Sequence, residues 1–195
     1  MAEIYHVRSP SGIAQRDFGW SPGFYEKLCE GNNSMPCWTD ENDARDLRKA
    51  FGLARTSREK GNHPFGAVLI SVTGELLLEA ENTVVLSGDL TAHAERNLLS
   101  LASTRFDQEM LSKATMYAST EPCSMCATAA RWVGVGRIVY GLSQARLRNT
   151  GNGGPRLPPN DFSCREMFKL ASRAVEIVGP LLEDEAAQVH EGFWR

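Results

Sequence analysis

The chain has 195 residues, a formal net charge of −3 at pH 7, 42% hydrophobic residues and 23% charged residues. This balance is typical of a globular protein, and the length suits one domain with a sizeable core. The slightly acidic charge disfavours a nucleic-acid binder, which usually carries a basic surplus, and the longest apolar runs, such as residues 65–70, are too short to span a bilayer.

The first 38 residues differ from the rest, because Gly, Pro, Ser and Asn interrupt them and they show little periodicity. We expect an N-terminal extension over residues 1–38 and a folded domain over residues 39–195. The N-terminus lacks the apolar segment of a secretory signal. We therefore expect a cytoplasmic protein whose cysteines stay reduced.

The folded domain is predicted to open with a helix that begins at Thr39 or Asp40 and ends at Gly61. A capping residue, acidic side chains in the first turn and an apolar face support this helix. Two predicted strands, over residues 64–71 and 75–82, flank the turn sequence "VTG". This arrangement indicates a β-hairpin.

Helices and strands alternate after the hairpin, and residues 144–161 are expected to form a long loop. The predicted order indicates an α/β fold, with a mixed sheet and helices on both of its faces. The hairpin should be antiparallel and the later crossovers parallel and right-handed. The patterns predict helices over 91–103, 122–134, 162–172 and 180–194, and strands over 114–120, 137–143 and 175–179.

Five cysteines are spaced irregularly, which argues against a disulfide framework. Cys123 and Cys126 form a C-x-x-C pair, whereas Cys29, Cys37 and Cys164 stand alone. By itself the pair is open to three interpretations: a structural zinc knuckle, a redox pair, or part of a catalytic metal site. The sequence has no second cysteine pair to complete a knuckle, and a redox pair usually follows the first strand of its fold.

A third metal ligand is offered by His93 in "TAHAER". His93 and Cys123 both stand where the chain enters a predicted helix, and the positive end of a helix dipole favours a thiolate. With Cys126 they can fill three corners of a tetrahedral zinc site and leave the fourth for water. Glu95 is too close to His93 to be a comfortable fourth ligand, but it is well placed to carry a proton of that water.

These residues form the pattern H-x-E…P-C-x-x-C, the signature of zinc deaminases. With "HPFGAVLIS", the "EN" that ends in Asn82, "TAHAE" and "EPCSMCATAARWVGVGRIVYG", they make the chain resemble the cytidine deaminase-like superfamily. Within it the chain is most similar to the branch of bacterial guanine deaminases, tRNA adenosine deaminases and nucleoside deaminases. The resemblance implies a three-layer α/β/α sandwich with a mixed five-stranded sheet, one Zn²⁺ per chain and a homodimer.

The resemblance also implies residue roles. His93, Cys123 and Cys126 would bind zinc, and Glu95 would move a proton from water to a ring nitrogen and then to the leaving amine. Substrate contacts would come from a further set of residues: Asn82, Phe65, Gly66, Ala67, Ala94 and Trp194.

The remaining polar residues receive plainer interpretations. Glu121 is expected to support or cap neighbouring backbone, and His63 to be a turn residue before Pro64. His6 and His190 are expected to be incidental. Three arginines near the long loop are expected to be solvated rather than to bind phosphate: Arg146, Arg148 and Arg156.

Two features bear on the substrate. The last predicted helix carries the acidic run 183–185, which together with the net charge disfavours tRNA. The guanine deaminases of the branch carry an acidic loop after the fourth strand, whereas here Asp161 is the one acid in that loop. We therefore expect a zinc-dependent hydrolytic deaminase of a free nucleobase, nucleoside or related amino-heterocycle, of guanine or cytosine type, that releases ammonia.

Two alternatives stay open. The first is a tRNA adenosine deaminase that converts adenosine to inosine, and the second is a non-catalytic, zinc-folded binding module. Glu95 argues against the second alternative, because a purely structural zinc site has no need of a carboxylate beside an open metal position.

Overall fold

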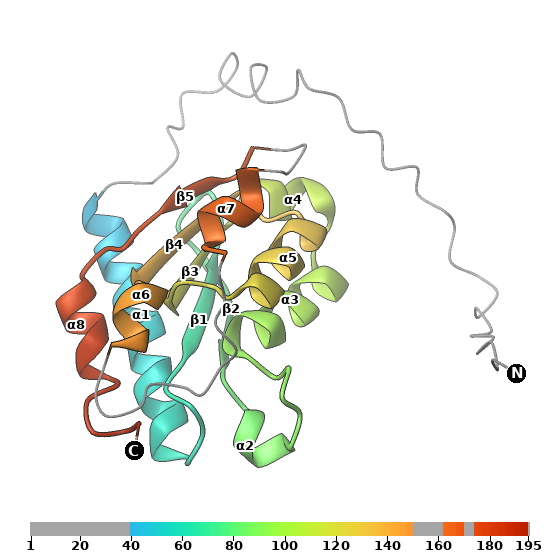
Figure 1. The fold of residues 1–195 in the computed structure, drawn as a ribbon. Coiled ribbons are helices and arrows are strands. Elements are labelled where there is room, and N and C mark those ends of the chain that lie inside the picture. Colours follow the sequence, from blue (N-terminus) through green and yellow to red (C-terminus); the bar gives the residue numbers. More distant parts are fainter. Residues whose placement is uncertain (1–39, 150–161, 170–173, 195) are drawn as a thin grey trace, which may run out of the picture. The chain divides into compact units, whose positions relative to one another are not determined.

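The computed structural model describes residues 40–149, 162–169 and 174–194, all within the unit Ser34–Arg195. Five strands form one mixed sheet in the order β2-β1-β3-β4-β5 (Figure 1). The strands are β1 Gly66–Ile70, β2 Leu76–Glu81, β3 Thr115–Thr120, β4 Arg137–Leu142 and β5 Glu176–Val178. The helices are α1 Asp40–Glu59, α2 Val84–Ser87, α3 Ala94–Arg105, α4 Gln108–Lys113, α5 Ser124–Val133, α6 Gln144–Arg148, α7 Cys164–Lys169 and α8 Glu183–Gln188.

The strand pairing follows the predicted order of elements. β1 pairs antiparallel with β2 and with β3, whereas β3 with β4 and β4 with β5 form parallel pairs. The hairpin of β1 and β2 is thus confirmed, and its turn uses Gly74 at a φ of 85°, which glycine adopts without steric cost. The helix α5 connects the parallel strands β3 and β4, as a crossover requires.

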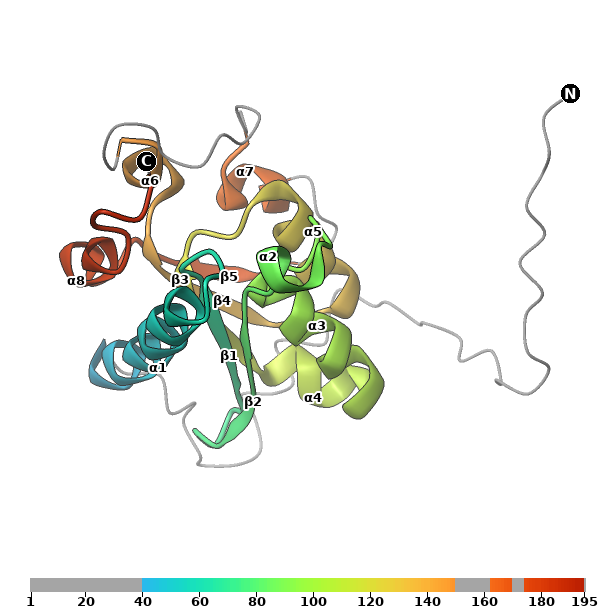
Figure 2. The ribbon, with the colours of Figure 1, turned by 90° about the horizontal axis from the view of Figure 1, so that it is seen from below.

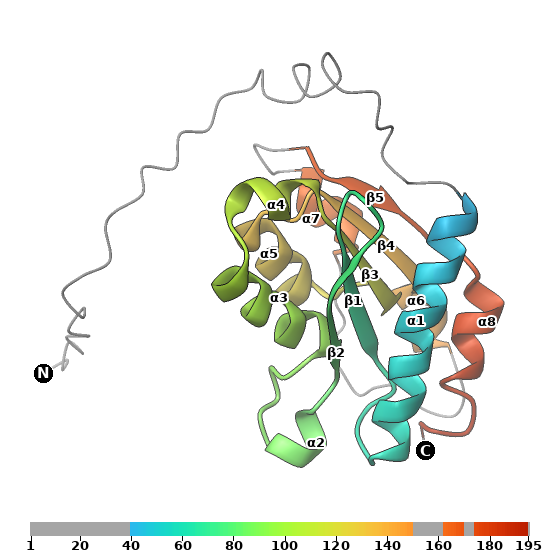
Figure 3. The same ribbon diagram turned by 180° about the vertical axis from the view of Figure 1, so that it is seen from behind.

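Helices cover both faces of the sheet, which confirms the predicted three-layer α/β/α sandwich. Figures 1, 2 and 3 show α1 and α8 on one face and α3, α4 and α5 on the other. β3 is buried along its whole length, and its side chains alternate between the two cores. Tyr117 enters the core that α1 and α8 cover, and Met116 enters the core that α3 and α5 cover. Among the described residues, no helix is both long enough and apolar enough for a membrane crossing.

Three short helices, α2, α4 and α6, were not predicted. Two of them begin at a side-chain cap: Asp107 accepts a hydrogen bond from the backbone N–H of Met110, and Ser143 from that of Arg146. Helices of five or six residues are too short to produce a periodic pattern, so the cap was the available signal. The expected loop over 144–161 therefore begins with a helix, and residues 150–161 lie outside the described part.

The predicted last helix, 180–194, was too long, because the structure has α8 over Glu183–Gln188 alone. Leu182 adopts a left-handed conformation with φ of 55°, so the helix cannot extend through it toward Pro180. Three acidic residues then fill the first turn, where the helix dipole favours them. α1 is helical from Asp40, the first described residue, whereas the domain boundary between residues 38 and 39 lies outside the described residues and stays a prediction.

Candidate active site

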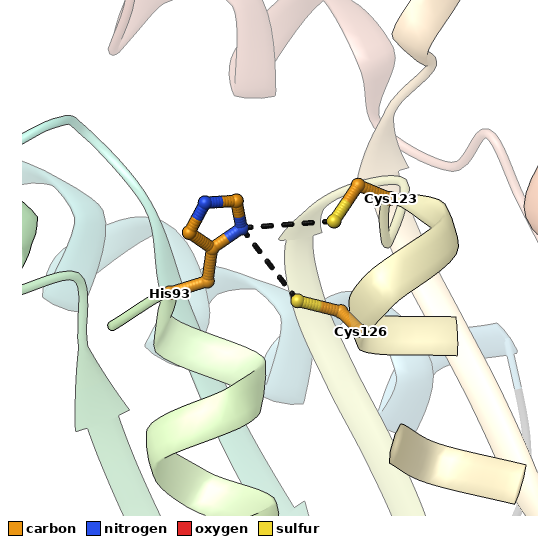
Figure 4. A group of neighbouring side chains, drawn as sticks. All are labelled: His93, Cys123 and Cys126. Atoms are coloured by element: carbon orange, nitrogen blue, oxygen red, sulfur yellow. Dashed lines mark hydrogen bonds between the residues drawn. The ribbon is translucent and has the colours of Figure 1, made fainter. Parts of the chain in front are cut away.

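Three potential metal ligands meet where two helices begin (Figure 4). His93 is the residue at the N-terminal cap of α3, Cys123 holds the same position at α5, and Cys126 lies in the first turn of α5. The Nδ1 atom of His93 lies 3.7 Å from the Sγ atom of Cys123 and 3.6 Å from the Sγ atom of Cys126. All three atoms lie within 4.8 Å of one another.

This spacing fits a tetrahedral zinc ion. With ordinary Zn–N and Zn–S bond lengths, tetrahedral geometry places the nitrogen and sulfur atoms ~3.6 Å apart. The two observed nitrogen–sulfur distances agree with that value, so the ligands need little rearrangement. One imidazole and two thiolates are also a donor set that zinc prefers.

The electrostatics of the group favour a thiolate before any metal arrives. A hydrogen bond from Cys126, together with one from His93, lowers the pKa of Cys123 to about 4. The same Cys123 thiolate, with burial, raises the pKa of Cys126 well above its ordinary value. One thiol of the pair is therefore already deprotonated, and a metal cation would draw the second proton away because it binds thiolates.

Glu95 lies beside this group without being one of the metal-ligand residues. Glu95 is 7% exposed as a residue, and its Oε2 atom lies 3.7 Å from the Sγ atom of Cys126. Burial, with a contribution from the negative Cys123, raises the pKa of Glu95 to about 7. A carboxyl group with a pKa near the working pH can both accept and release a proton, as a general acid–base group must.

Asn82 is completely buried at the end of β2. Its Oδ1 atom accepts a hydrogen bond of 3.0 Å from the backbone N–H of Val84, so it does cap the following loop. Its Nδ2 atom has no hydrogen-bond partner within the described residues. Because a buried N–H group without a partner costs free energy, this amide is suited to an incoming polar group.

The expected substrate-contact residues 65–67 and Ala94 divide into two kinds. Phe65 is partly buried, with its ring 5.3 Å from that of His190 and 6.1 Å from that of Trp194. Ala67 and Ala94 lie in the core, so any contact from them would come from the backbone. Gly66 has a packing reason to be glycine, because a Cβ atom there would collide with the backbone of α1.

The chain's last described residues lie next to the end of β3. The indole Nε1 of Trp194 donates a hydrogen bond of 3.2 Å to Nδ1 of His190, and the two rings are stacked. The Nε2 atom of His190 lies 3.4 Å from Oγ1 of Thr120, the last residue of β3. His190 is 2% exposed, so the prediction that it is incidental was wrong. The His–Trp spacing of four residues was the available signal in the sequence.

Glu121 supports backbone as expected. Its Oε2 atom accepts a hydrogen bond from the N–H of Gln144, and its Oε1 atom accepts one from the N–H of Cys164. These are the first residues of α6 and α7, whose N–H groups lack partners within the helix. Glu121 therefore caps two helices just before the metal-ligand segment begins.

A mixed sheet that places a histidine and two cysteines at the starts of two helices, with a protonatable carboxyl group beside them, defines a class of zinc-dependent hydrolases. The zinc-binding region of cytidine and deoxycytidylate deaminases matches residues 40–142 of this chain. The chain therefore belongs to this family of zinc-binding deaminases. It is a hydrolase of C–N bonds, and zinc is its cofactor.

Individual relatives span most of the chain. A probable cytosine deaminase from Schizosaccharomyces pombe is 39% identical over 79% of this chain and 93% of its own length. A tRNA-specific adenosine deaminase from Haemophilus influenzae is 30% identical over 80% of this chain and 84% of its own. Among solved structures, a protein in complex with 8-azaguanine superposes with a TM-score of 0.63 and 27% identity, covering 76% of this chain and 81% of that one.

Proposed function

We propose that this enzyme deaminates a free nucleobase of cytosine type and releases ammonia. The observation that carries the proposal is the buried Glu95 carboxyl group, 3.7 Å from a cysteine of the metal group and with a pKa near neutrality. The choice of base is supported by the 39% identity to the probable cytosine deaminase, which extends over 93% of that protein.

In this proposal His93, Cys123 and Cys126 hold the zinc ion. When bound, zinc acts as a Lewis acid that makes water a nucleophile near neutral pH. Glu95 accepts a proton from the attacking water and delivers it to the ring nitrogen beside the amine-bearing carbon. A second proton transfer through Glu95 to the amine lets the C–N bond break, so that ammonia leaves and a carbonyl group remains on the ring.

The other expected site residues would orient the base. The free Nδ2 of Asn82 would donate a hydrogen bond to the ring, and the backbone N–H of Ala94 would serve as a further donor. Phe65 and Trp194 would contact the ring faces, with the backbone of residues 66 and 67 beside them. A planar heterocycle suits such surroundings, because aromatic side chains stack on planar rings.

The main alternative substrate is adenosine in tRNA, on which the 30% identical relative acts according to its name. The expectation that the acidic run 183–185 repels phosphate needs correction, because these side chains are paired. Arg146 lies 2.7 Å from Asp184 and 3.7 Å from Glu183, and Arg48 lies 3.1 Å from Glu185. The same pairing engages Arg146 in α6, so these charges favour neither substrate strongly.

Ammonia release from zinc-loaded protein tests the proposal directly. The panel is cytosine, guanine, adenine, their nucleosides and a tRNA anticodon stem-loop, with Glu95→Gln as the matched inactive control. We expect cytosine to give the highest kcat/KM, with little dependence on salt. Inosine formation in tRNA that falls steeply with salt, by a log–log slope of roughly 0.7 to 0.9 per phosphate contact, would replace this proposal with the tRNA alternative.

We also propose that the enzyme is cytoplasmic and, from the family resemblance, that it is a homodimer. Sedimentation of the purified protein tests the dimer, and fractionation of the cells that produce it tests the location.

A further inference from the structure

His63 lies four residues after the last residue of α1 and is held in place through its backbone. Its carbonyl oxygen accepts hydrogen bonds from the hydroxyl of Ser57, at 2.7 Å, and from the N–H of Phe65, at 2.8 Å. The Ser57 hydroxyl also lies 3.0 Å from the carbonyl oxygen of Asn82. One buried serine thus fixes the position of His63 relative to Asn82, the residue with the free amide N–H.

The imidazole of His63 lies within an aromatic cluster, which we define as His63, Phe65, His190, Phe193 and Trp194. Its ring centre lies 5.5 Å from that of Trp194 and 6.3 Å from that of Phe193. Trp194 also contacts Phe65 and is fixed by its hydrogen bond to His190. Because His190 contacts Thr120, the last residue of β3, the aromatic cluster borders the strand end from which the chain continues to Cys123 and Cys126.

The three histidines of the described residues differ in how their ring nitrogens are used. His190 has a polar atom at each ring nitrogen, and His93 directs Nδ1 at both cysteines. None of the hydrogen bonds among the described residues involves a ring nitrogen of His63, although the side chain is only partly exposed. A partly buried imidazole between aromatic rings, with both nitrogens unused, can bind a polar group of a ligand.

His63 is not one of the residues of the metal group, but its charge interacts with that of His93. In the proposed orientation, a base that offers its amine-bearing carbon to the metal group directs its opposite edge away from that group. In cytosine that edge holds a ring N–H beside a carbonyl group. Burial lowers the pKa of His63, and a neutral imidazole has one unprotonated nitrogen, which can accept a hydrogen bond from such an N–H group.

We propose that His63 is a specificity-determining residue, whose imidazole accepts a hydrogen bond from the ring N–H of a free base. This inference rests on the proposed function. A nucleoside carries its sugar at that ring nitrogen and lacks the N–H. His63 thereby selects the free base over the nucleoside.

The test compares cytosine with 1-methylcytosine, in which a methyl group replaces the ring hydrogen. His63→Phe keeps an aromatic ring against Trp194 and Phe193 but removes both hydrogen-bonding groups, and His63→Gln keeps a donor and an acceptor. Phe193→Leu is the matched control, because it alters the aromatic cluster without changing a polar group. Zinc content and melting temperature establish that each variant is folded and loaded.

For His63→Phe we expect KM for cytosine to rise about 10-fold, the effect of one lost hydrogen bond, with a smaller change in kcat. The preference for cytosine over 1-methylcytosine should fall by a similar factor, and His63→Gln should restore part of it. The dissociation constant of cytosine should rise by a similar factor when calorimetry compares Glu95→Gln with the double variant Glu95→Gln/His63→Phe. Phe193→Leu should retain the preference.

An unchanged KM and an unchanged preference in His63→Phe would overturn the role of His63 while leaving the proposed function intact. An equal loss of preference in Phe193→Leu would also overturn it, because the effect would then come from packing. Wild-type protein that neither binds nor deaminates cytosine would instead overturn the proposed function, and this inference with it.

Discussion

Two buried polar clusters lie at opposite ends of the parallel pair β3 and β4. The ionic cluster consists of Asp43, Tyr117 and Arg137, and Arg137 is the first residue of β4. The metal cluster consists of His93, Glu95, Cys123 and Cys126, and Cys123 comes three residues after the last residue of β3. Both clusters are formed by residues that the chain brings together from different elements.

The ionic cluster satisfies its own charges. Arg137 donates hydrogen bonds of 2.8 and 2.7 Å to the two carboxylate oxygens of Asp43, and the hydroxyl of Tyr117 donates one of 2.7 Å. Burial, with the bond to Asp43, raises the pKa of Tyr117 and keeps it protonated as the donor. A buried pair with this geometry is stable because each charge has its partner within the protein.

The metal cluster is arranged differently, because its groups lie at longer distances from one another. Its closest contacts are 3.6 to 3.7 Å and all involve sulfur. The carboxyl and thiol groups of the metal cluster are therefore better placed to bind a ligand than to bond to one another. The difference between the clusters indicates that one was arranged for stability and the other for binding and proton transfer.

The largest expected effect separates activity from stability. Glu95→Gln should reduce turnover by roughly 10²–10⁴-fold, because the amide cannot carry the proton, while zinc stays bound. Ammonia release and metal analysis on the same sample measure both quantities. Tyr117→Phe in the ionic cluster is the control and should keep full turnover per folded molecule. Wild-type turnover in Glu95→Gln would end the assignment of Glu95.

The next effect concerns the ionic cluster alone. Asp43→Ala leaves the guanidinium of Arg137, 5% exposed at its side chain, without its principal partner. Removing one member of a buried pair costs about 3–5 kcal/mol, measured by urea unfolding. Glu185→Ala breaks the exposed pair with Arg48 and should cost less than ~1 kcal/mol. Equal costs for the two substitutions would contradict the distinction between buried and exposed pairs.

Removing the metal should affect both activity and stability. Zinc binds the folded protein, so a concentration about 100-fold above its dissociation constant adds ~2.7 kcal/mol to the free energy of unfolding. Chelation, His93→Ala or Cys126→Ala should each abolish the bound zinc and lower the melting temperature. Metal analysis and calorimetry check this pair of results. If apo and holo protein melted at the same temperature, the metal cluster would contribute nothing to folding.

A smaller effect should appear in the pH dependence of stability. Burial lowers the pKa of His190 to about 4, whereas an unfolded histidine has a pKa of ~6.5. Between these values the unfolded chain binds one more proton, so stability is complete above pH ~6.5 and falls as the pH drops toward ~4. The total loss is on the order of 3 kcal/mol. The free energy of unfolding, measured with urea at several pH values in this range, should fall more steeply with decreasing pH in the wild type than in His190→Gln. The same pH dependence in both proteins would refute the role of His190.

Local patterns in the sequence predicted the longer elements and the candidate metal ligands. α1, β3 and α5 are long or strongly apolar, so their periodicity is clear, and their residues fold as predicted. His93, Cys123 and Cys126 were identifiable because each stands in a short motif at a helix start, where the backbone direction and the dipole follow from local rules. The mixed α/β sandwich followed from the order of those elements.

Tertiary structure alone decided which distant residues pair. Asp43 and Arg137 are 94 positions apart, and nothing in either neighbourhood predicts the partner. Likewise, the burial of His190 depends on Thr120, 70 residues earlier, and the neutralisation of Glu185 depends on Arg48. Local rules describe residues up to about four positions apart, whereas these contacts depend on how α1 and α8 pack on the sheet. The sequence therefore predicts which residues could bind the metal, and the packing of α1 and α8 decides which side chains surround them.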